Sequence, residues 1–235
     1  MYRIYCDFDE TVTTRDVGSQ ILARFGTPVA FDIWKDFDAG IRTPAECLRI
    51  ACETARDITD IGIEAIIEAQ VLRSGFVEFV SFCRERSIPL TIVSDGFSIY
   101  IRQILARVGL GYIPIWTNTI ERNDLGTLDV TFEHEREGCK HCASCKCAGM
   151  ITTSEESDTI VYLGDGYSDW CPSSLADVVF ATRDLKRQCG ELGIPHHPFN
   201  DFFEVRAILE NYLQERPKYR REQAHRRRKE LITIE

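Results

Sequence analysis

Three short apolar segments of this sequence are each followed at once by polar residues that can bind a ligand, and segments with helical periodicity separate them. The apolar segments cover residues 2–6, 90–93 and 159–163. The polar residues behind them are Asp7 and Asp9, then Ser94 and Asp95, then Asp165 and Asp169. Strands that alternate with helices predict a parallel sheet covered on both faces, and ligands bind at the carboxyl edge of such sheets. The sequence therefore predicts a doubly wound, Rossmann-like α/β fold with a site at that edge.

The stretch from Asp16 to about Leu72 interrupts this alternation. Apolar residues recur there at three- and four-residue spacing with no convincing strand, and Gly and Pro clusters divide it into three or four helices. We expect an α/β core of residues 1–14 and 74–215, an inserted helical cap of residues 15–73, and a basic tail of residues 216–235. Within the core we expect a hairpin over residues 113–132 and helices over residues 75–86, 97–108 and 202–214.

The net charge of −9 over 235 residues argues against nucleic-acid or anionic-membrane binding, because phosphate groups attract basic surfaces. The tail differs from the rest of the chain, since it carries eight Lys or Arg against three Glu. Such a tail is either a solvated, frayed helix end or a binding site for an anionic partner.

The amino terminus and the cysteines indicate the compartment. No run reaches the roughly 18 apolar residues that a membrane span needs, and the first ten residues form a predicted strand ending in acids rather than a secretion signal. The ten cysteines are then intracellular thiols or metal ligands and not a disulfide framework. We expect a cytoplasmic protein that is a monomer or a homodimer.

The acidic residues predict a metal site. Asp7 and Asp9 repel each other, and a hard cation neutralises such a pair most simply. Together with Asp165 and Asp169 they can supply the oxygen ligands of an octahedral Mg²⁺ site.

The remaining polar residues predict a phosphate site. Ser94 ends a strand and Gly96 is expected to open the next helix, so that a hydroxyl and helix amides form a phosphate seat. Phosphoryl transfer develops negative charge that a fixed cation must balance, and Lys146 is the candidate. Each of these features alone is common on surfaces, but their combination in this order indicates phosphoryl-transfer chemistry.

At this point the sequence resembles the haloacid dehalogenase superfamily of phosphatases. DFDETVT is similar to its first motif, TIVSDG to its second, Lys146 to its third and GDGYSD to its fourth. The insertion resembles the cap of the phosphoserine-phosphatase-like subgroup. Within that subgroup the closest likeness is to the methionine-salvage phosphatases that act on 2-hydroxy-3-keto-5-methylthiopentenyl-1-phosphate. The likeness spans about residues 2–213.

The resemblance implies a role for each motif residue. Asp7 is the nucleophile that forms an aspartyl phosphate, and Asp9 protonates the leaving group and then activates water. Ser94 and Lys146 hold the phosphoryl oxygens. Mg²⁺ is bound by Asp7, the Asp9 carbonyl and Asp165, while Asp169 supports the metal or ligates it through water.

The resemblance also implies a substrate, a small phosphorylated metabolite, and residues that contact it. Asn118 matches a residue near the phosphate, and the cap offers the candidates Arg15, Asp16, Phe31, Trp34 and Arg42. Two positions depart from the family pattern: Glu10 replaces a small residue, and Asp95 replaces a glycine and could repel the phosphate or contact a polar substrate. The alternatives are a phosphoserine or other phosphometabolite phosphatase, a phosphotransferase, and a non-catalytic regulatory module on the same fold.

A cysteine-rich loop from Gly138 leads to the predicted phosphate-binding lysine. Cys139, Cys142, Cys145 and Cys147 fall within nine residues. Four thiolates at this density could hold a structural Zn²⁺, although the usual arrangement of two separated CxxC pairs is fused here, so that a zinc site is weighed somewhat below the alternatives. The alternatives are a reduced thiol-rich loop that positions Lys146, and a redox switch in which oxidation distorts that loop.

Overall fold

The computed structural model describes residues 1–136, 139–215 and 218–234. Its sheet has the strand order β4-β3-β2-β1-β5-β6-β7, and every pairing is parallel except that of β3 with β4. The strands are β1 (Tyr2–Cys6), β2 (Leu90–Phe97), β3 (Ile115–Arg122), β4 (Leu128–Thr131), β5 (Thr159–Gly164), β6 (Val178–Ala181) and β7 (His197–Pro198). The prediction of a doubly wound, mostly parallel sheet is confirmed, and the hairpin forms where it was expected.

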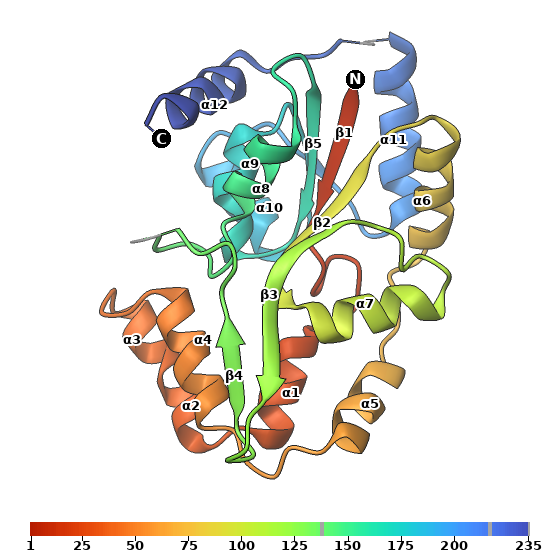
Figure 1. Cartoon of the computed structure of the whole chain (residues 1–235). Coiled ribbons are helices and arrows are strands. Elements are labelled where there is room, and N and C mark those ends of the chain that lie inside the picture. The colour runs from red at the N-terminus through yellow and green to blue at the C-terminus, as the bar shows by residue number, and fades with distance from the viewer. Residues whose placement is uncertain (137–138, 216–217, 235) are drawn as a thin grey trace.

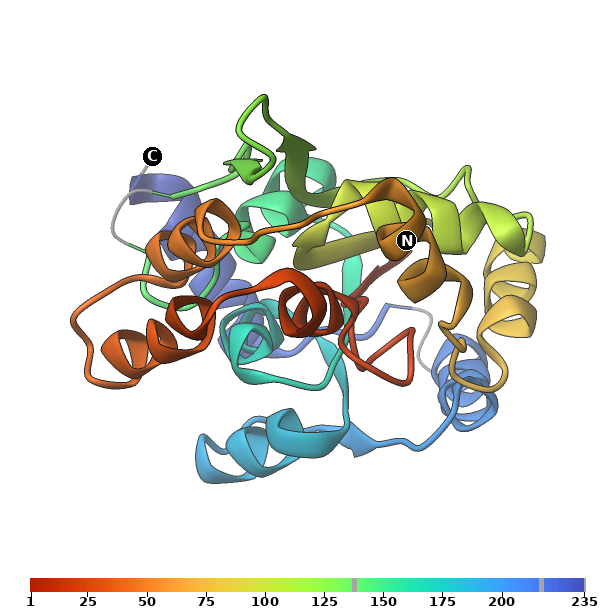
Figure 2. The same cartoon turned by 90° about the horizontal axis from the view of Figure 1, so that it is seen from below.

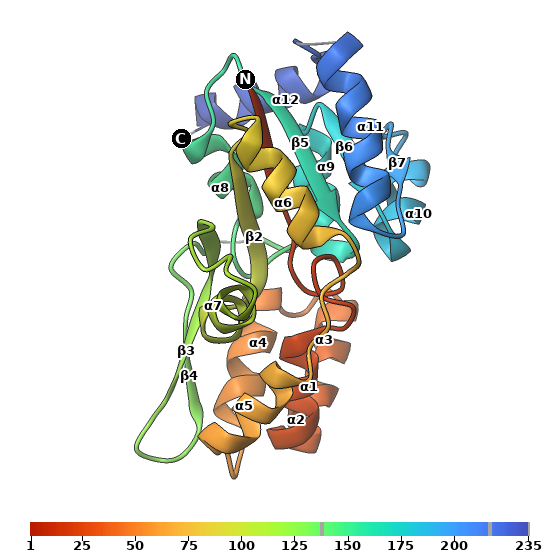
Figure 3. The same ribbon diagram turned by 90° about the vertical axis from the view of Figure 1, so that its right-hand side faces the viewer.

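Helices cover both faces of this sheet (Figures 1 and 3). One face carries α6 (Phe76–Glu85) and α11 (Phe202–Glu215). The other carries α8 (Lys146–Thr153), α9 (Trp170–Leu175) and α10 (Arg183–Glu191), and α12 (Glu222–Ile234) packs against α9. Strand alternation supplies both cores, since Ile4 and Cys6 of β1 join the cluster under α6 while Tyr5 joins the opposite one.

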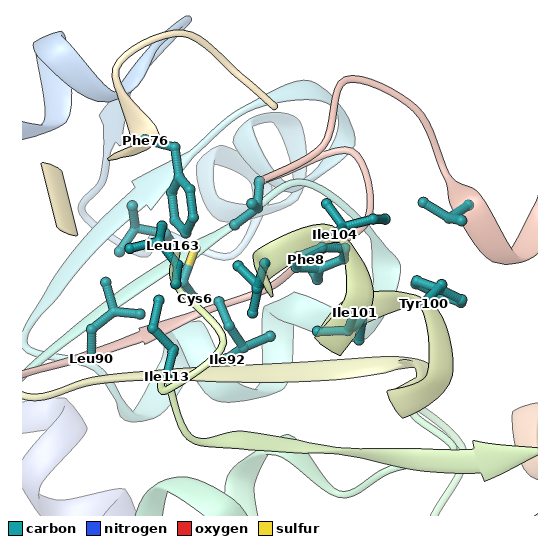
Figure 4. Close-up of a cluster of buried hydrophobic side chains, with 14 of the residues drawn as sticks. Cys6, Phe8, Phe76, Leu90, Ile92, Tyr100, Ile101, Ile104, Ile113 and Leu163 are labelled. Carbon is teal, nitrogen blue, oxygen red and sulfur yellow. The ribbon is translucent and has the colours of Figure 1, made fainter. Parts of the chain in front are cut away.

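The larger core begins at the central strands. Cys6, Ile92 and Leu163 come from three adjacent strands and pack with Phe76 of α6, as Figure 4 shows. Strand β5 is buried at every position because helices cover both faces of the sheet there. Such a strand must be apolar along nearly its whole length. The acids Asp7 and Asp165 follow directly after β1 and β5, and Ser94 and Asp95 lie near the end of β2, so the carboxyl edge collects them.

The inserted helices lie beyond that carboxyl edge, below the sheet in Figure 1 and facing the viewer in Figure 2. They are α1 (Val17–Phe25), α2 (Pro28–Asp32), α3 (Trp34–Asp38), α4 (Pro44–Glu53) and α5 (Asp60–Glu68). Local signals fix their starts: the Asp16 side chain caps α1, and Thr43 and Glu46 form a capping box at α4. These helices rest on the core through α7 (Ser98–Arg107), which contacts α5, and through β4, which contacts α4.

The chain enters and leaves the insertion through two adjacent segments. Thr13 pairs with Leu72 in an antiparallel bridge, and the Arg73 amide donates to the Val12 carbonyl at 2.7 Å. Both crossings therefore lie beside the loop that follows β1.

Two expectations about local structure are wrong. Strand β2 continues past Ser94 to Phe97 and α7 begins at Ser98, so Gly96 does not open a helix. The tail is not simply solvated, because Arg221 and Arg228 are buried against α9: Arg228 Nη1 lies 3.1 Å from Asp177 Oδ2. Gly138 and the tail residues 216, 217 and 235 lie outside the described residues. Over the described part of the chain, no helix has the length and apolar character that crossing a membrane would need.

The aromatic contact between α6 and α11 generates a stability prediction. Phe202 is fully buried, and its ring centroid lies 5.0 Å from that of Phe76 and 5.4 Å from that of Phe79. Phe202→Ala is expected to lower the free energy of unfolding by about 3–5 kcal/mol, because it opens a cavity in the core. Phe203→Ala, at the neighbouring exposed position, is the control and should cost much less, below about 1 kcal/mol. Urea denaturation measures both, and equal losses would contradict the assignment of this core.

Candidate active site

A cavity of about 290 Å³ opens at the carboxyl edge of the sheet, between the core and the inserted helices. It is lined by Asp7, Asp9, Glu10, Asp16, Gly18, Ser19, Leu22, Trp34, Leu48, Ser94, Asp95, Gly96, Phe97, Tyr100, Lys146, Asp165, Gly166 and Ser168. Residues from the ends of β1, β2 and β5 and from the start of α8 therefore meet in one place.

The floor of the cavity is a buried ion cluster. Lys146 Nζ lies 2.7 Å from Asp7 Oδ1 and 2.6 Å from Asp169 Oδ1, and all three side chains are less than a tenth exposed. Burial opposes the charge of Lys146, but Asp169, Asp7 and Asp95 outweigh it and raise the lysine pKa well above its ordinary value. The lysine is therefore a fixed ammonium at neutral pH.

Asp169 organises this cluster. Its Oδ1 accepts from Lys146 and from the Tyr162 hydroxyl, and its Oδ2 accepts from the amides of Asp165 and Gly166. An ionised carboxylate offers about four acceptor positions, so those of Asp169 are all used. This geometry fits a residue that positions Asp165 and Lys146, with no acceptor position left over for a metal or for a water bound to one.

Asp7, Asp165 and Asp169 place carboxylate oxygens within 4.8 Å of one another, and no other His, Cys, Asp or Glu group in the described residues comes as close to sharing an ion. Burial raises the pKa of Asp7 to about 7 against the effect of Lys146. Burial and the charges of Asp7 and Asp169 raise that of Asp165 to about 9. Three ionised carboxylates beside one ammonium would leave two negative charges unbalanced, and the raised pKa values of Asp7 and Asp165 reflect this repulsion and their burial. A hard divalent cation, which prefers oxygen ligands, would balance these charges in place of the protons. The residues present therefore fit a metal such as Mg²⁺.

Ser94 lies at the same edge with its hydroxyl proton available. The hydroxyl oxygen accepts from the Gly96 amide at 3.0 Å, and Ser94 is almost fully buried. The hydroxyl oxygen accepts from this amide while its own proton stays free to donate, and Ser94 lines the cavity, so the hydroxyl can donate to a group bound there. The expected phosphate seat therefore rests on an extended strand and not on a helix N-terminus.

Asp9 lines the cavity, but its side chain does not belong to the carboxylate trio. Its Oδ1 accepts from the Val17 amide at the start of α1, and its Oδ2 accepts from the Tyr100 hydroxyl on α7. Burial, followed by repulsion from Asp16, raises the pKa of Asp9 well above its ordinary value. A carboxyl group with a raised pKa suits proton donation near neutral pH.

The structure gives Asp95, one of the two departures from the family pattern, a structural contact. Asp95 Oδ1 accepts from the amides of Ala143 and Ser144, at 3.1 and 2.8 Å. Burial raises its pKa to about 6. These bonds tie the end of β2 to the loop that delivers Lys146, so this carboxylate holds the lysine loop in place.

Glu10, the other departure, has a left-handed backbone with φ 58°, a conformation that glycine adopts more easily. Its carboxylate lies 3.0 Å from Arg183, whose Nε lies 3.5 Å from Asp165. Arg73 donates to the carbonyls of Glu10 and Thr11. Two arginines from distant segments therefore hold the loop after β1 against the carboxyl edge of the sheet, beside Asp165.

The predicted substrate-contacting residues divide into two sets. Asp16 and Trp34 line the cavity, whereas Arg15, Phe31 and Arg42 are not among its lining residues. Arg15 and Phe31 are exposed, and Arg42 pairs with Asp36 at 3.0 Å.

Asn118 also lies outside the cavity lining. Its amide donates to the Asp95 carbonyl at 2.8 Å, and its buried Oδ1 has no hydrogen-bond partner. Asn118 therefore lies on β3, beside the end of β2, and bonds to that strand's backbone instead of lining the cavity.

The cysteines do not support the predicted Zn²⁺ site. Cys139 and Cys142 have their sulfurs 3.6 Å apart, while the Cys147 thiol lies 3.2 Å from Cys171 of α9. The Cys145 sulfur instead accepts from the Ala148 amide and caps α8. Cys142 contacts both Cys139 and Cys145, whereas Cys147 pairs with Cys171. In the described residues the four sulfurs do not form a group close enough to hold an ion.

Several side chains of the site had no signal in the sequence. The Tyr162 hydroxyl donates to Asp169, the Tyr100 hydroxyl to Asp9, and the Thr11 hydroxyl to Asp165. Each of these hydrogen bonds joins residues that are far apart in the chain or on different elements. Gly164 is the one position here whose residue type indicates a close contact. A Cβ at this position would lie 2.6 Å from the Asp169 carboxyl carbon, which explains the glycine before Asp165.

Comparison with known proteins gives a consistent result. A sequence model of the family described as Putative Phosphatase matches residues 3–188. The chain is 29% identical over 225 residues to the 2-hydroxy-3-keto-5-methylthiopentenyl-1-phosphate phosphatase of Brevibacillus brevis. The aligned region covers 90% of this chain and 96% of that protein. The phosphatase of the same name from Bacillus cereus is 28% identical over 219 residues, covering 90% and 97%. A solved structure of a phospho-aspartyl intermediate analogue of phosphoserine phosphatase matches with a TM-score of 0.63 and 22% identity, covering 88% and 99%, and so has the same fold.

The raised pKa values of the carboxylates predict how Mg²⁺ changes stability with pH. A carboxyl whose pKa is raised on folding stabilises the protein below its unfolded pKa, and this contribution is lost as pH rises through the folded pKa, here about 7 for Asp7 and about 9 for Asp165. Mg²⁺ competes with these protons, so the rise in unfolding temperature on adding Mg²⁺ should be several degrees larger at about pH 8.5 than at about pH 6.

Thermal unfolding in EDTA and in excess Mg²⁺ measures this difference. Asp165→Asn should remove most of the Mg²⁺ effect, whereas Asp124→Asn, at an exposed position in the β3–β4 turn, should leave it unchanged. A Mg²⁺ shift that is independent of pH, or that survives in Asp165→Asn, would contradict a metal site made of these carboxylates.

Proposed function

The chain belongs to the Putative Phosphatase family, and from this premise we propose that it hydrolyses the phosphate monoester of a small metabolite by way of an aspartyl phosphate on Asp7. The fold and the family identify a phosphatase of the haloacid dehalogenase type. The observation that carries the mechanism is the Lys146 ammonium, which lies between Asp7 and Asp169 on the floor of the cavity. A carboxylate nucleophile beside a fixed cation is the arrangement that phosphoryl transfer needs.

The first step transfers the phosphoryl group to the protein. A carboxylate oxygen of Asp7 attacks phosphorus, the bond from phosphorus to the ester oxygen breaks, and the Asp9 carboxyl gives its proton to that departing oxygen. The second step reverses the role of Asp9, which takes a proton from water as the water oxygen attacks phosphorus. The bond from phosphorus to Asp7 then breaks, inorganic phosphate leaves, and both carboxyl groups return to their starting states.

The phosphoryl oxygens need donors and positive charge around them. Lys146 supplies an ammonium within hydrogen-bond distance of Asp7, and Ser94 supplies a hydroxyl whose oxygen is already bonded to the Gly96 amide. Asp7, Asp165 and the backbone carbonyl of Asp9 would hold Mg²⁺, which when bound neutralises phosphoryl charge. Asp169 keeps Lys146 and the Asp165 loop in place.

The cavity lining indicates the kind of substrate. Leu22, Trp34 and Leu48 form an apolar wall contributed by the insertion, which we take to be a cap of residues 15–73 over a core of residues 1–14 and 74–215. Among the described residues that line the cavity, Lys146 is the only Lys or Arg, and Glu10 and Asp16 also face it. A carboxylate on the substrate would therefore meet negative charge without a free cation. The site favours an uncharged, partly apolar alcohol. This is consistent with 2-hydroxy-3-keto-5-methylthiopentenyl-1-phosphate, which the names of the relatives give as their substrate, and with a role in methionine salvage, and it disfavours phosphoserine.

Removal of the nucleophile tests the proposal. Asp7→Asn should lower kcat for every phosphate monoester by more than about a thousandfold, because asparagine cannot form the acyl phosphate. Asp124→Asn, which changes the charge in the same way far from the cavity, should retain full activity. Mg²⁺-dependent release of phosphate from p-nitrophenyl phosphate measures both. Comparable activity of Asp7→Asn and the unmodified protein would overturn the role of Asp7.

The substrate preference gives a separate prediction. The unmodified protein should hydrolyse 2-hydroxy-3-keto-5-methylthiopentenyl-1-phosphate with a kcat/KM at least about a hundredfold above that for phosphoserine. Trp34→Ala should raise KM for the former about tenfold with little change in kcat, since the wall binds ground state and transition state alike. Phe31→Ala, an exposed aromatic that does not line the cavity, is the matched control. A preference for phosphoserine would contradict this assignment.

A further inference from the structure

Tyr100 is a buried residue on α7 whose hydroxyl group reaches the cavity wall. The side chain is fully buried and its hydroxyl donates to Asp9 Oδ2. Phe8 and Phe97 pack around its ring, each with a centroid 6.2 Å away, and Figure 4 shows Tyr100 beside Phe8 at the end of the apolar cluster. The ring is thus fixed by the core, and its polar atom is directed at one carboxylate.

Gly96 keeps the path between these two groups open. A Cβ at this position would lie 1.9 Å from the Tyr100 hydroxyl oxygen and 2.6 Å from Asp9 Oδ2. Both distances are far below van der Waals contact, so any side chain here would separate the pair. The absence of a side chain at residue 96 is therefore a condition for the Tyr100–Asp9 hydrogen bond.

A second donor completes the arrangement from the other side. The Val17 amide, at the start of α1, donates to Asp9 Oδ1 at 2.8 Å. One donor comes from the core and one from the insertion, and together they fix the plane of the carboxyl group. Each carboxylate oxygen can accept two hydrogen bonds, so one position on each oxygen remains for a substrate or water.

We propose that Tyr100 is a positioning residue that aims the Asp9 carboxyl group at the ester oxygen and at the attacking water, and that Gly96 is required for it to do so. The inference depends on the proposed function, in which Asp9 moves the proton in both steps. Tyr100 does not touch the substrate's phosphoryl group in this role. It acts through Asp9, whose proton goes to the ester oxygen in the first step and is replaced from water in the second.

This role has a signature that packing alone would not produce. An alkyl phosphate releases a strongly basic alkoxide that must be protonated as it leaves, whereas p-nitrophenyl phosphate releases a stable phenolate that needs little help. A misaimed Asp9 therefore slows the first step for alkyl esters more than for the nitrophenyl ester. The parameter kcat/KM isolates that step, since it covers events only up to the first irreversible release.

Tyr100→Phe tests the proposal because it removes the hydroxyl and keeps the ring. We expect kcat/KM to fall about tenfold to a hundredfold for an alkyl phosphate such as glycerol phosphate, and less than about threefold for p-nitrophenyl phosphate. The second step uses Asp9 with either ester, so the variant should also show a burst of p-nitrophenol before a slower steady rate. Gly96→Ala should show the same selectivity between the two esters, since it forces the pair apart.

Tyr112→Phe, which removes a hydroxyl from an exposed ring, is the matched control and should change neither rate. Urea denaturation confirms that each variant is folded. Equal losses on both esters in Tyr100→Phe, or no loss on either, would overturn the role of Tyr100 while leaving the proposed function intact. The proposed function itself fails separately, if the unmodified protein hydrolyses neither ester in Mg²⁺.

Discussion

The buried contact between the Lys146 ammonium and the carboxylates of Asp7 and Asp169 is the interaction on which the arrangement of the site depends. Burying charges without partners is costly, so each of these groups is stable in the interior only while the others are in place. Asp7 follows β1, Lys146 begins α8 and Asp169 follows β5. The contact can form only after the parallel sheet has brought these segments together. The burial of apolar side chains in the two cores offsets the free-energy cost of burying these charges.

Each charged group is in turn held by a structural element of its own. Asp169 accepts the amides of Asp165 and Gly166, and Asp95 accepts two amides of the loop that precedes Lys146. Backbone amides are rigid donors, because their positions are set by the chain and not by a rotamer. A preorganised site loses little free energy to rearrangement when charge develops in the reaction. The loop after β1, which contains the left-handed Glu10, is held against the sheet in a similar way. Arg183 pairs with the Glu10 carboxylate, and Arg73 donates to the Thr11 carbonyl.

The sequence predicted the sheet and the convergence of the acids because both follow from local rules. A short apolar run followed by Asp7, Ser94 or Asp165 marks a strand end, and parallel strands place such ends on one edge. The start of α7 was misplaced at Gly96, because the backbone remains extended through Phe97 and glycine signals a break without giving its direction.

Contacts between distant side chains could not be predicted in this way. Which residue meets the Asp9 carboxyl, and whether Asn118 faces the cavity or the Asp95 carbonyl, depends on side-chain directions that no local pattern specifies. The cysteine spacing left a zinc site open as one alternative, because density in sequence does not specify whether four sulfurs converge in space. The tail was expected to be solvated because nothing nearby in sequence indicates that Asp177 accepts Arg228.

The central claim is that Asp7 carries the phosphoryl group during turnover, and chemical trapping of that residue tests it most directly. Borohydride reduces an aspartyl phosphate to homoserine, so turnover quenched with borohydride and analysed by peptide mass spectrometry identifies the phosphorylated residue. We expect homoserine at position 7 only when Mg²⁺ and substrate are both present. Omitting either one should leave Asp7 unmodified. An unmodified Asp7 in protein that is turning over substrate, or homoserine at another aspartate, would contradict it.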